Sequence, residues 1–140
     1  MSDQLFVYGS LMKNFYNYDK YLRGHVVAIE DGYVSGTLYD MPYKGYPALL
    51  DGTTRVHGEV ITVKDINAVL PAMDAMEGFF GKDDDEYKRI PREVTLNSGE
   101  VITLDVYFYH AHDFDIYFEE QAILIPNGDW RDFKENHHNK

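Results

Sequence analysis

Glu77 is the residue best placed in this chain to do acid–base chemistry. Ile66, Leu70 and Met73 recur at helical spacing, and at about 100° per residue Glu77 falls within roughly 40° of the same helix face. The sequence therefore predicts a carboxylate on a face that should be buried. Burial and the negative end of the helix dipole both disfavour the charged form, so we expect the pKa of Glu77 to be raised. Such a group can accept and return a proton near neutral pH.

The position of Glu77 at the end of its helix leaves a simpler alternative. Gly78 is a natural stop for the helix, and if that end frays, Glu77 points into water. A titration of Glu77 near the ordinary value of about 4.3 would identify this case. Within the same segment, Asp65 is the expected N-cap, and Pro71 should kink the helix or divide it into two short pieces.

A glycine turn near the N-terminus is the second candidate for chemistry. Residues 5–8 are apolar or aromatic and predict a buried strand, which Gly9 and Ser10 then end. Glycine tolerates backbone angles that other residues avoid, so consecutive N–H groups can be exposed there. Such donors suit a carboxylate or a developing oxyanion. The alternative is a strand that simply ends at a glycine turn.

Several other side chains invite functional interpretations that we consider weaker. His110 and His112 share one face of a predicted strand, near Asp113 and Asp115, but polar residues at a strand end usually belong to surface loops, and we expect no metal site. Ser10 lacks a recognisable His–Asp partnership, which argues against a serine hydrolase. Four tyrosines would either line a pocket or pack in the core: Tyr39, Tyr46, Tyr87 and Tyr107.

Charge and composition exclude several classes of function. With 13 Lys and Arg against 24 Asp and Glu, the 140-residue chain has a formal charge of -11, and no basic patch opposes it, so we expect no nucleic-acid partner. The absence of cysteine excludes disulfides, thiol nucleophiles and zinc–thiolate sites. No apolar run approaches the roughly 20 residues that span a bilayer, and residues 1–4 lack the features of a signal peptide. We expect a cytoplasmic monomer or weak homodimer that does not bind membranes.

The remaining pattern predicts many short strands around one clear helix. The helix follows Asp65, and 30–32 and 51–52 look like turns or strand ends. We expect strands over 25–29, 33–41, 48–50, 56–63, 87–96 and 101–109. These elements predict a single α+β domain over 1–134, with a small, mostly antiparallel sheet curled into a barrel, and a polar tail over 135–140.

Three landmarks, in this order and spacing, resemble the gamma-glutamylcyclotransferase-like family, especially its small bacterial members and the gamma-glutamylamine cyclotransferases. They are Tyr8-Gly9-Ser10-Leu11, Asp74-Ala75-Met76-Glu77-Gly78-Phe79 and Gly128-Asp129-Trp130. The stretches 36–40, 46–49 and 56–60 also look like this family, so the resemblance covers nearly the whole chain. It implies a small mixed barrel with flanking helices.

The resemblance also implies a reaction and a set of site residues. The α-amino group of a gamma-glutamyl compound attacks its own γ-carbonyl, giving 5-oxoproline and a free amine or amino acid, without metal, nucleotide or redox cofactor. Tyr8, Gly9, Ser10 and Leu11 would bind the substrate, and Glu77 would be the general acid/base. The acidic stretch 83–86 suggests a leaving amine that stays cationic. Two alternatives remain: a non-catalytic domain that binds a small carboxylate, and an amide hydrolase acting at the same site.

Overall fold

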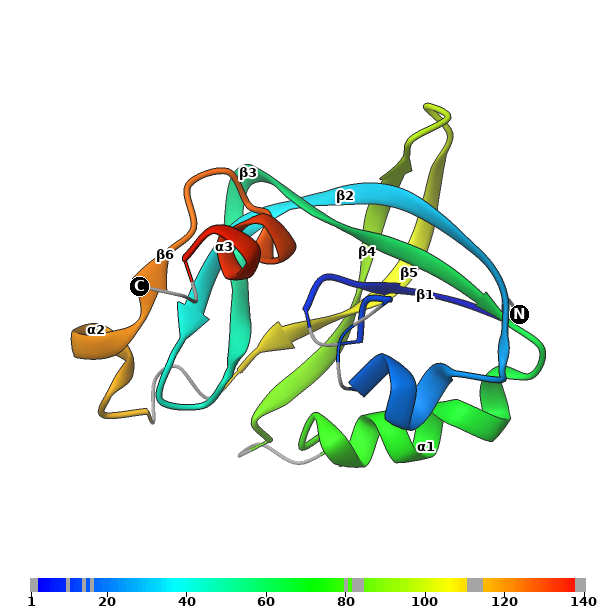
Figure 1. Ribbon diagram of the computed structural model, residues 1–140, viewed down its shortest axis with the longest axis horizontal. Helices are drawn as coiled ribbons and strands as arrows, with labels where there is room; N and C mark the ends of the chain where they lie inside the picture. Colours follow the sequence, from blue (N-terminus) through cyan, green and yellow to red (C-terminus); the bar gives the residue numbers. More distant parts are fainter. Residues whose placement is uncertain are drawn as a thin grey trace.

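A computed structural model describes residues 3–9, 11–13, 15, 17–79, 81, 85–110 and 115–137 (Figure 1). The elements, in chain order, are β1 (Gln4–Val7), η1 (Tyr18–Leu22, a short π-helix), β2 (Val26–Met41), β3 (Tyr46–Val63), α1 (Ile66–Met76), β4 (Tyr87–Leu96), β5 (Val101–Tyr109), α2 (Phe118–Gln121), β6 (Ile123–Leu124) and α3 (Trp130–His137). No helix within these residues is long and apolar enough to cross a membrane. The α+β class is confirmed.

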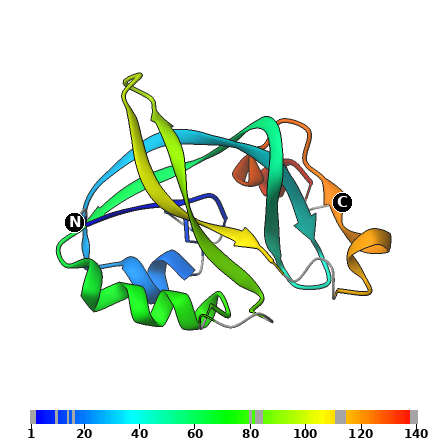
Figure 2. The same ribbon diagram turned by 180° about the vertical axis from the view of Figure 1, so that it is seen from behind.

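One curved sheet carries the fold. Its strand order is β1-β3-β2-β4-β5, β6 pairs with β2, and every pairing among the described strands is antiparallel. The long β2–β3 hairpin arches over β1, while α1 and η1 lie side by side below it (Figures 1 and 2). β1, η1 and α1 thus lie on the same side of this hairpin (Figures 1 and 2).

The predicted barrel is not closed. β1 and β5 are the two ends of the strand order, and no ladder joins them. They nevertheless lie close together, because the Tyr8 hydroxyl at the end of β1 donates a hydrogen bond to the main-chain oxygen of Tyr107 in β5. The sheet is therefore curled and open, with a seam between β1 and β5.

The turn expected at 30–32 and the strand end expected at 51–52 are both wrong. Gly32 lies inside β2, opposite Gly58 of β3 and Leu96 of β4. A Cβ on Gly32 would lie 2.9 Å from the Thr95 oxygen, and one on Gly58 would lie 2.2 Å from the Val7 oxygen. These glycines let backbones approach closely, rather than reversing the chain.

The expected strand end at 51–52 is a bulge within β3. Gly36 of β2 pairs with Thr54 of β3, whereas the next residue, Thr37, pairs with Leu50, so residues 51–53 are extra on β3. The Thr37 hydroxyl donates to the Asp51 oxygen at 3.1 Å. Bulges of this kind bend a strand and increase its twist, so β3 remains one strand through this region.

Helix α1 begins as predicted but is not divided. Asp65 is the N-cap, and its side chain accepts a hydrogen bond from the Asn67 N–H at 3.0 Å. Pro71 lies inside a single helix whose buried residues are Ile66, Val69 and Met73. Because this buried face continues on both sides of Pro71, core packing holds the helix together where the proline removes a hydrogen-bond donor.

Helix α3 replaces the beginning of the predicted tail, since it continues to His137, and residues 138–140 lie outside the described part of the chain. Its first residue, Trp130, is 2% exposed, and the indole Nε1–H donates to Asp40 Oδ1 at 3.1 Å. Lys134 Nζ lies 3.6 Å from the same oxygen. The buried Asp40 carboxylate therefore anchors α3 to β2.

Trp130→Phe should destabilise the protein by about 1–3 kcal/mol, because the buried Asp40 carboxylate loses a donor. Urea unfolding followed by far-UV circular dichroism measures this free energy. A loss below about 0.5 kcal/mol would contradict the anchoring role of the indole–carboxylate hydrogen bond.

Candidate active site

A pocket opens at the seam between β1 and β5, next to the end of α1. Its empty space, including the part that is open to solvent, is about 470 Å³. Its lining residues are Phe6, Val7, Tyr8, Gly9, Leu11, Tyr46, Pro47, Met76, Glu77, Tyr87 and Tyr107. The structure thus brings together the candidate site residues named from the sequence, with two exceptions. Ser10 lies outside the described residues, and Tyr39 packs instead on Phe118, with ring centroids 5.2 Å apart.

Hydrogen bonds fix the backbone of Glu77 at the end of α1. The Glu77 N–H donates to the Met73 oxygen at 2.9 Å. Gly78 has a φ of 68°, and its N–H donates to the Ala75 oxygen at 3.1 Å, while the Phe79 N–H donates to the Asp74 oxygen at 2.8 Å. This is the Schellman pattern, so the helix ends in a defined turn rather than fraying.

The Glu77 carboxylate has an unusual environment. No hydrogen bond to it is present within the described residues. Its pKa is raised from 4.5 to about 8, first because burial penalises the charged form, and then because the negative charges of Glu86 and Asp74 lie nearby. A carboxyl group with this pKa can exist in either protonation state near neutral pH.

Glu86 is the second carboxylate at this end of the helix. Its Oε2 accepts hydrogen bonds from the Tyr46 hydroxyl at 2.6 Å and from Lys44 Nζ at 2.8 Å. The Glu86 N–H donates to the Gly78 oxygen at 3.2 Å, and a Cβ on Gly78 would lie 3.0 Å from Glu86 Cβ. Glycine at position 78 thus provides both the positive φ and the space against Glu86.

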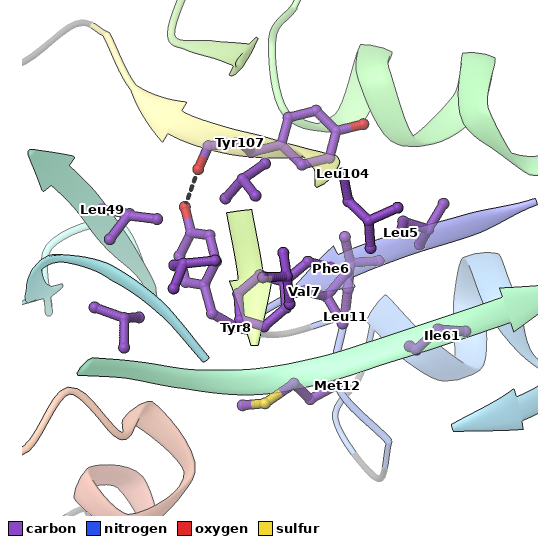
Figure 3. Close-up of a cluster of buried hydrophobic side chains, with 14 of the residues drawn as sticks. Leu5, Phe6, Val7, Tyr8, Leu11, Met12, Leu49, Ile61, Leu104 and Tyr107 are labelled. Atoms are coloured by element: carbon purple, nitrogen blue, oxygen red, sulfur yellow. Dashed lines mark hydrogen bonds between the residues drawn. The ribbon is translucent and has the colours of Figure 1, made fainter. Parts of the chain in front are cut away.

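The tyrosines around the pocket use their hydroxyls as fixed donors. Tyr8 donates to the Tyr107 main-chain oxygen (Figure 3), and Tyr87 donates to the Pro47 oxygen at 2.6 Å. Tyr107 in turn donates to Asp74 Oδ1 at 2.6 Å. Burial is the largest cause of the raised pKa of both Tyr8 and Tyr87. The pocket wall is therefore aromatic, and these hydroxyls remain neutral and bonded to other groups.

A buried glutamate holds the loop that follows β1. The Met12 N–H donates to the Gly9 oxygen at 3.0 Å, and the Lys13 N–H donates to Glu59 Oε1 at 2.8 Å. From α3, Arg131 Nη2 donates to Glu59 Oε2 at 3.1 Å and to the Lys13 oxygen at 2.8 Å. A Cβ on Gly9 would lie 2.7 Å from Pro47 Cγ. The loop is consequently held close to β3.

The sequence patterns did not indicate the supporting roles of Glu59, Asp74 and Glu86. Glu59 could have been suspected, because it is the one carboxylate in the predicted strand 56–63. Asp115 is one of the residues that we considered with His110 and His112 as a possible metal site. Its Oδ2 accepts hydrogen bonds from the Tyr43 and Tyr109 hydroxyls. No group of three or more possible metal ligands occurs within the part of the chain that the structure describes, and that part omits His112 and Asp113.

Glu77→Gln should stabilise the protein at high pH but hardly at low pH. The folded-state pKa is above the unfolded value, so the wild type loses stability as pH rises from 4.5 to about 8. With allowance for partial exposure of the side chain, we expect a gain of about 2–4 kcal/mol at pH 8.5 and less than about 1 kcal/mol at pH 5. Urea unfolding of both proteins at both pH values measures the difference; a gain independent of pH would contradict the raised pKa.

Comparison with known proteins places the chain in a family. Residues 5–132 match the family described as gamma-glutamyl cyclotransferase, AIG2-like. The chain is 31% identical over 134 residues to a protein of Methanocaldococcus jannaschii named "Putative gamma-glutamylcyclotransferase MJ1514", covering 94% of this chain and 98% of the relative. The protein therefore belongs to the gamma-glutamyl cyclotransferase, AIG2-like family, which supports a cyclotransferase function in general terms.

Solved structures confirm the fold. YkqA from Bacillus subtilis matches with a TM-score of 0.67 and 20% identity, and this chain is covered completely but spans only 44% of YkqA. An AIG2-like protein from Mus musculus matches with a TM-score of 0.63 and 22% identity, over 86% of this chain and 84% of that one. The curled antiparallel sheet with few helices is thus shared with these proteins.

Proposed function

We propose that this protein is a gamma-glutamyl cyclotransferase that releases 5-oxoproline, with Glu77 as general acid/base. The observation that supports the proposal is the Glu77 carboxylate, which lines an aromatic pocket, has no hydrogen-bond donor within the described residues and has a pKa of about 8. The substrate's α-ammonium group would provide the missing partner. Family membership makes this the reaction to test first.

Glu77 is the single general acid/base that the proposed mechanism requires. Glu77 takes a proton from the substrate's α-ammonium group, and the freed nitrogen attacks the γ-carbonyl carbon, forming the ring C–N bond. Glu77 gives this proton to the leaving nitrogen, and collapse of the tetrahedral intermediate breaks the original amide C–N bond. The ring nitrogen then loses its second proton to Glu77, which passes it to the released amine. A carboxylate with a pKa of about 8 is a far better acceptor for an ammonium proton than one at 4.5. Because nucleophile and electrophile are already tethered, positioning is the protein's main task.

The loop after β1 is the proposed anion-binding element. Gly9 and Leu11 line the same pocket as Glu77, and Ser10 lies between them in the sequence. We propose that main-chain N–H groups of 9–11 hold the substrate carboxylate, the developing oxyanion, or both, with Tyr8 forming the adjacent wall. Tyr46, Tyr87 and Tyr107 would shape the remaining wall around the aliphatic part of the glutamyl group.

We propose the charge of the leaving group but not its chemical identity. Of the acidic stretch 83–86, Asp85 and Glu86 are described, and Glu86 adjoins the end of α1. Together with Asp74, Glu86 makes this side of the pocket negative, although Lys44 offsets part of that charge. This balance favours a cationic leaving amine. A cytoplasmic location, a monomeric or weakly dimeric state and the lack of a nucleic-acid partner stay predictions.

Glu77→Gln should reduce 5-oxoproline release by about 10²–10⁴-fold, because the amide cannot accept the ammonium proton. Mass spectrometry of the products from a panel of gamma-glutamyl amines, amino acids and peptides measures this release. Glu100→Gln, at an exposed position, is the matched control and should behave like the wild type.

The product distinguishes the alternatives in the same experiment. Free glutamate in place of 5-oxoproline would indicate an amide hydrolase. Saturable binding of a gamma-glutamyl compound without turnover would indicate a binding domain. Undiminished 5-oxoproline release by Glu77→Gln would overturn the role of Glu77.

The pH dependence of kcat/KM should report the environment of Glu77. If its ionised form is the base, kcat/KM rises with pH through a midpoint near 8. Glu86→Gln removes a negative neighbour, so the pKa of Glu77 falls and the midpoint should move to lower pH. A midpoint unchanged by Glu86→Gln, measured with the same substrate, would contradict this electrostatic link.

A further inference from the structure

Three side chains join the end of α1 to the sheet. Asp74 Oδ1 accepts hydrogen bonds from Arg89 Nε at 2.8 Å and from the Tyr107 hydroxyl at 2.6 Å, and Asp74 Oδ2 accepts from Arg89 Nη2 at 3.2 Å. Arg89 belongs to β4 and Tyr107 to β5, so one carboxylate connects the helix to two strands. Arg89 Nη1 also donates to Asp105 of β5 at 2.8 Å.

This cluster acts on the turn that carries Glu77. Asp74 precedes Glu77 by three residues, and its main-chain oxygen accepts the Phe79 N–H that closes the turn. The Arg89 guanidinium lies 5.0 Å from the centroid of the Phe79 ring, so Arg89 contacts the turn on both sides of Glu77. We propose that Asp74, Arg89 and Tyr107 form a positioning cluster that fixes the last turn of α1 against β4 and β5, and so holds the Glu77 carboxylate in the pocket within a fixed set of charges.

The geometry explains why arginine occupies position 89. A guanidinium places two parallel donors against one carboxylate, which a lysine cannot do. The Asp74 and Arg89 side chains are only 19% and 23% exposed, so water screens this pair incompletely. Tyr107 supplies a third, neutral hydrogen bond. Together these interactions restrict both the position and the direction of the Asp74 carboxylate.

The same charges act on Glu77 with opposite signs. Asp74 contributes to the raised pKa of Glu77. Because Arg89 is paired with Asp74 at 2.8 Å, its positive charge should oppose that contribution. Removing the Asp74 charge should therefore lower the pKa of Glu77, and removing the Arg89 charge should raise it. The titratable groups that interact electrostatically with Glu77 are Tyr8, Tyr46, Asp74, Glu86, Tyr87 and Tyr107. Arg89 adjoins two of them, Asp74 and Tyr107.

The test compares Asp74→Asn, Arg89→Gln and Arg89→Lys with the wild type. The midpoint of the Glu77 side-chain carboxyl titration is followed by ¹³C NMR, and kcat and KM are measured separately. Arg92→Gln is the matched control, because Arg92 lies on the same strand and pairs with the exposed Asp51 at 3.3 Å. Thermal unfolding shows which variants remain folded, and Arg89→Lys keeps the charge if Arg89→Gln fails to fold.

We expect the titration midpoint to fall by about one pH unit in Asp74→Asn and to rise by about one in Arg89→Gln. In Arg89→Lys the midpoint should stay near the wild-type value while kcat falls about 10-fold with little change in KM, because the charge remains and the paired donors are lost. Arg92→Gln should change neither quantity.

A fall of the midpoint in Asp74→Asn together with a rise in Arg89→Gln would support the proposed role of the cluster. Loosening of the turn alone would expose Glu77 and lower its pKa in both variants. Equal midpoints, or movements in the same direction, would overturn the proposal. The kinetic part rests on the proposed cyclotransferase function, but the titration does not. If no gamma-glutamyl compound is turned over, the proposed function fails while the titration still decides the role of the cluster.

Discussion

The structure depends on one half-buried carboxylate, that of Glu77, for which no donor is present among the described residues. Placing Glu77 in an aromatic pocket costs free energy when the group is charged, because water is removed and no described group replaces its hydrogen bonds. The surrounding tyrosines do not relieve this cost, since each donates to another acceptor. The protein therefore presents a proton acceptor whose natural partner would be a cation brought by a ligand.

The open seam of the sheet is what makes room for this group. Close crossings at Gly32 and Gly58, together with the bulge at residues 51–53, curl the sheet until β1 and β5 come near each other. The Tyr8 hydroxyl then spans the seam to the Tyr107 main-chain oxygen, where a closed barrel would have a ladder. Helix α1 ends beside this seam, so the sheet edge and the helix terminus together define the pocket. The candidate site and the open edge of the sheet thus share one location.

Local patterns were sufficient to predict much of this arrangement. The helical spacing from Ile66 onward placed Glu77 on the buried face, and Gly78 marked the end of α1, as the Schellman turn confirms. The strands over 87–96 and 101–109 are present as predicted. These features follow from residues within a few positions of one another, which is the range over which periodicity and capping act.

Features that depend on distant segments could not be predicted in this way. Gly32 was interpreted as a turn, yet its role comes from Gly58 and Leu96 across two ladders. The Asp74–Arg89 pair and the contact between Glu59 and Arg131 likewise join residues far apart in the sequence, where pattern and propensity carry no information. Pro71 was expected to kink α1 or divide it into two pieces, and the helix is not divided, because packing of the buried face holds it together. Tertiary contacts decided these points.

The measurement that most directly tests this account is a ¹³C NMR titration of the Glu77 side-chain carboxyl in the wild-type protein, assigned by comparison with Glu77→Gln. We expect a midpoint near 8, because the carboxylate is half-buried beside two like charges. A midpoint near 4.5 would show a solvated carboxylate at a helix end, and would contradict the central role given to Glu77.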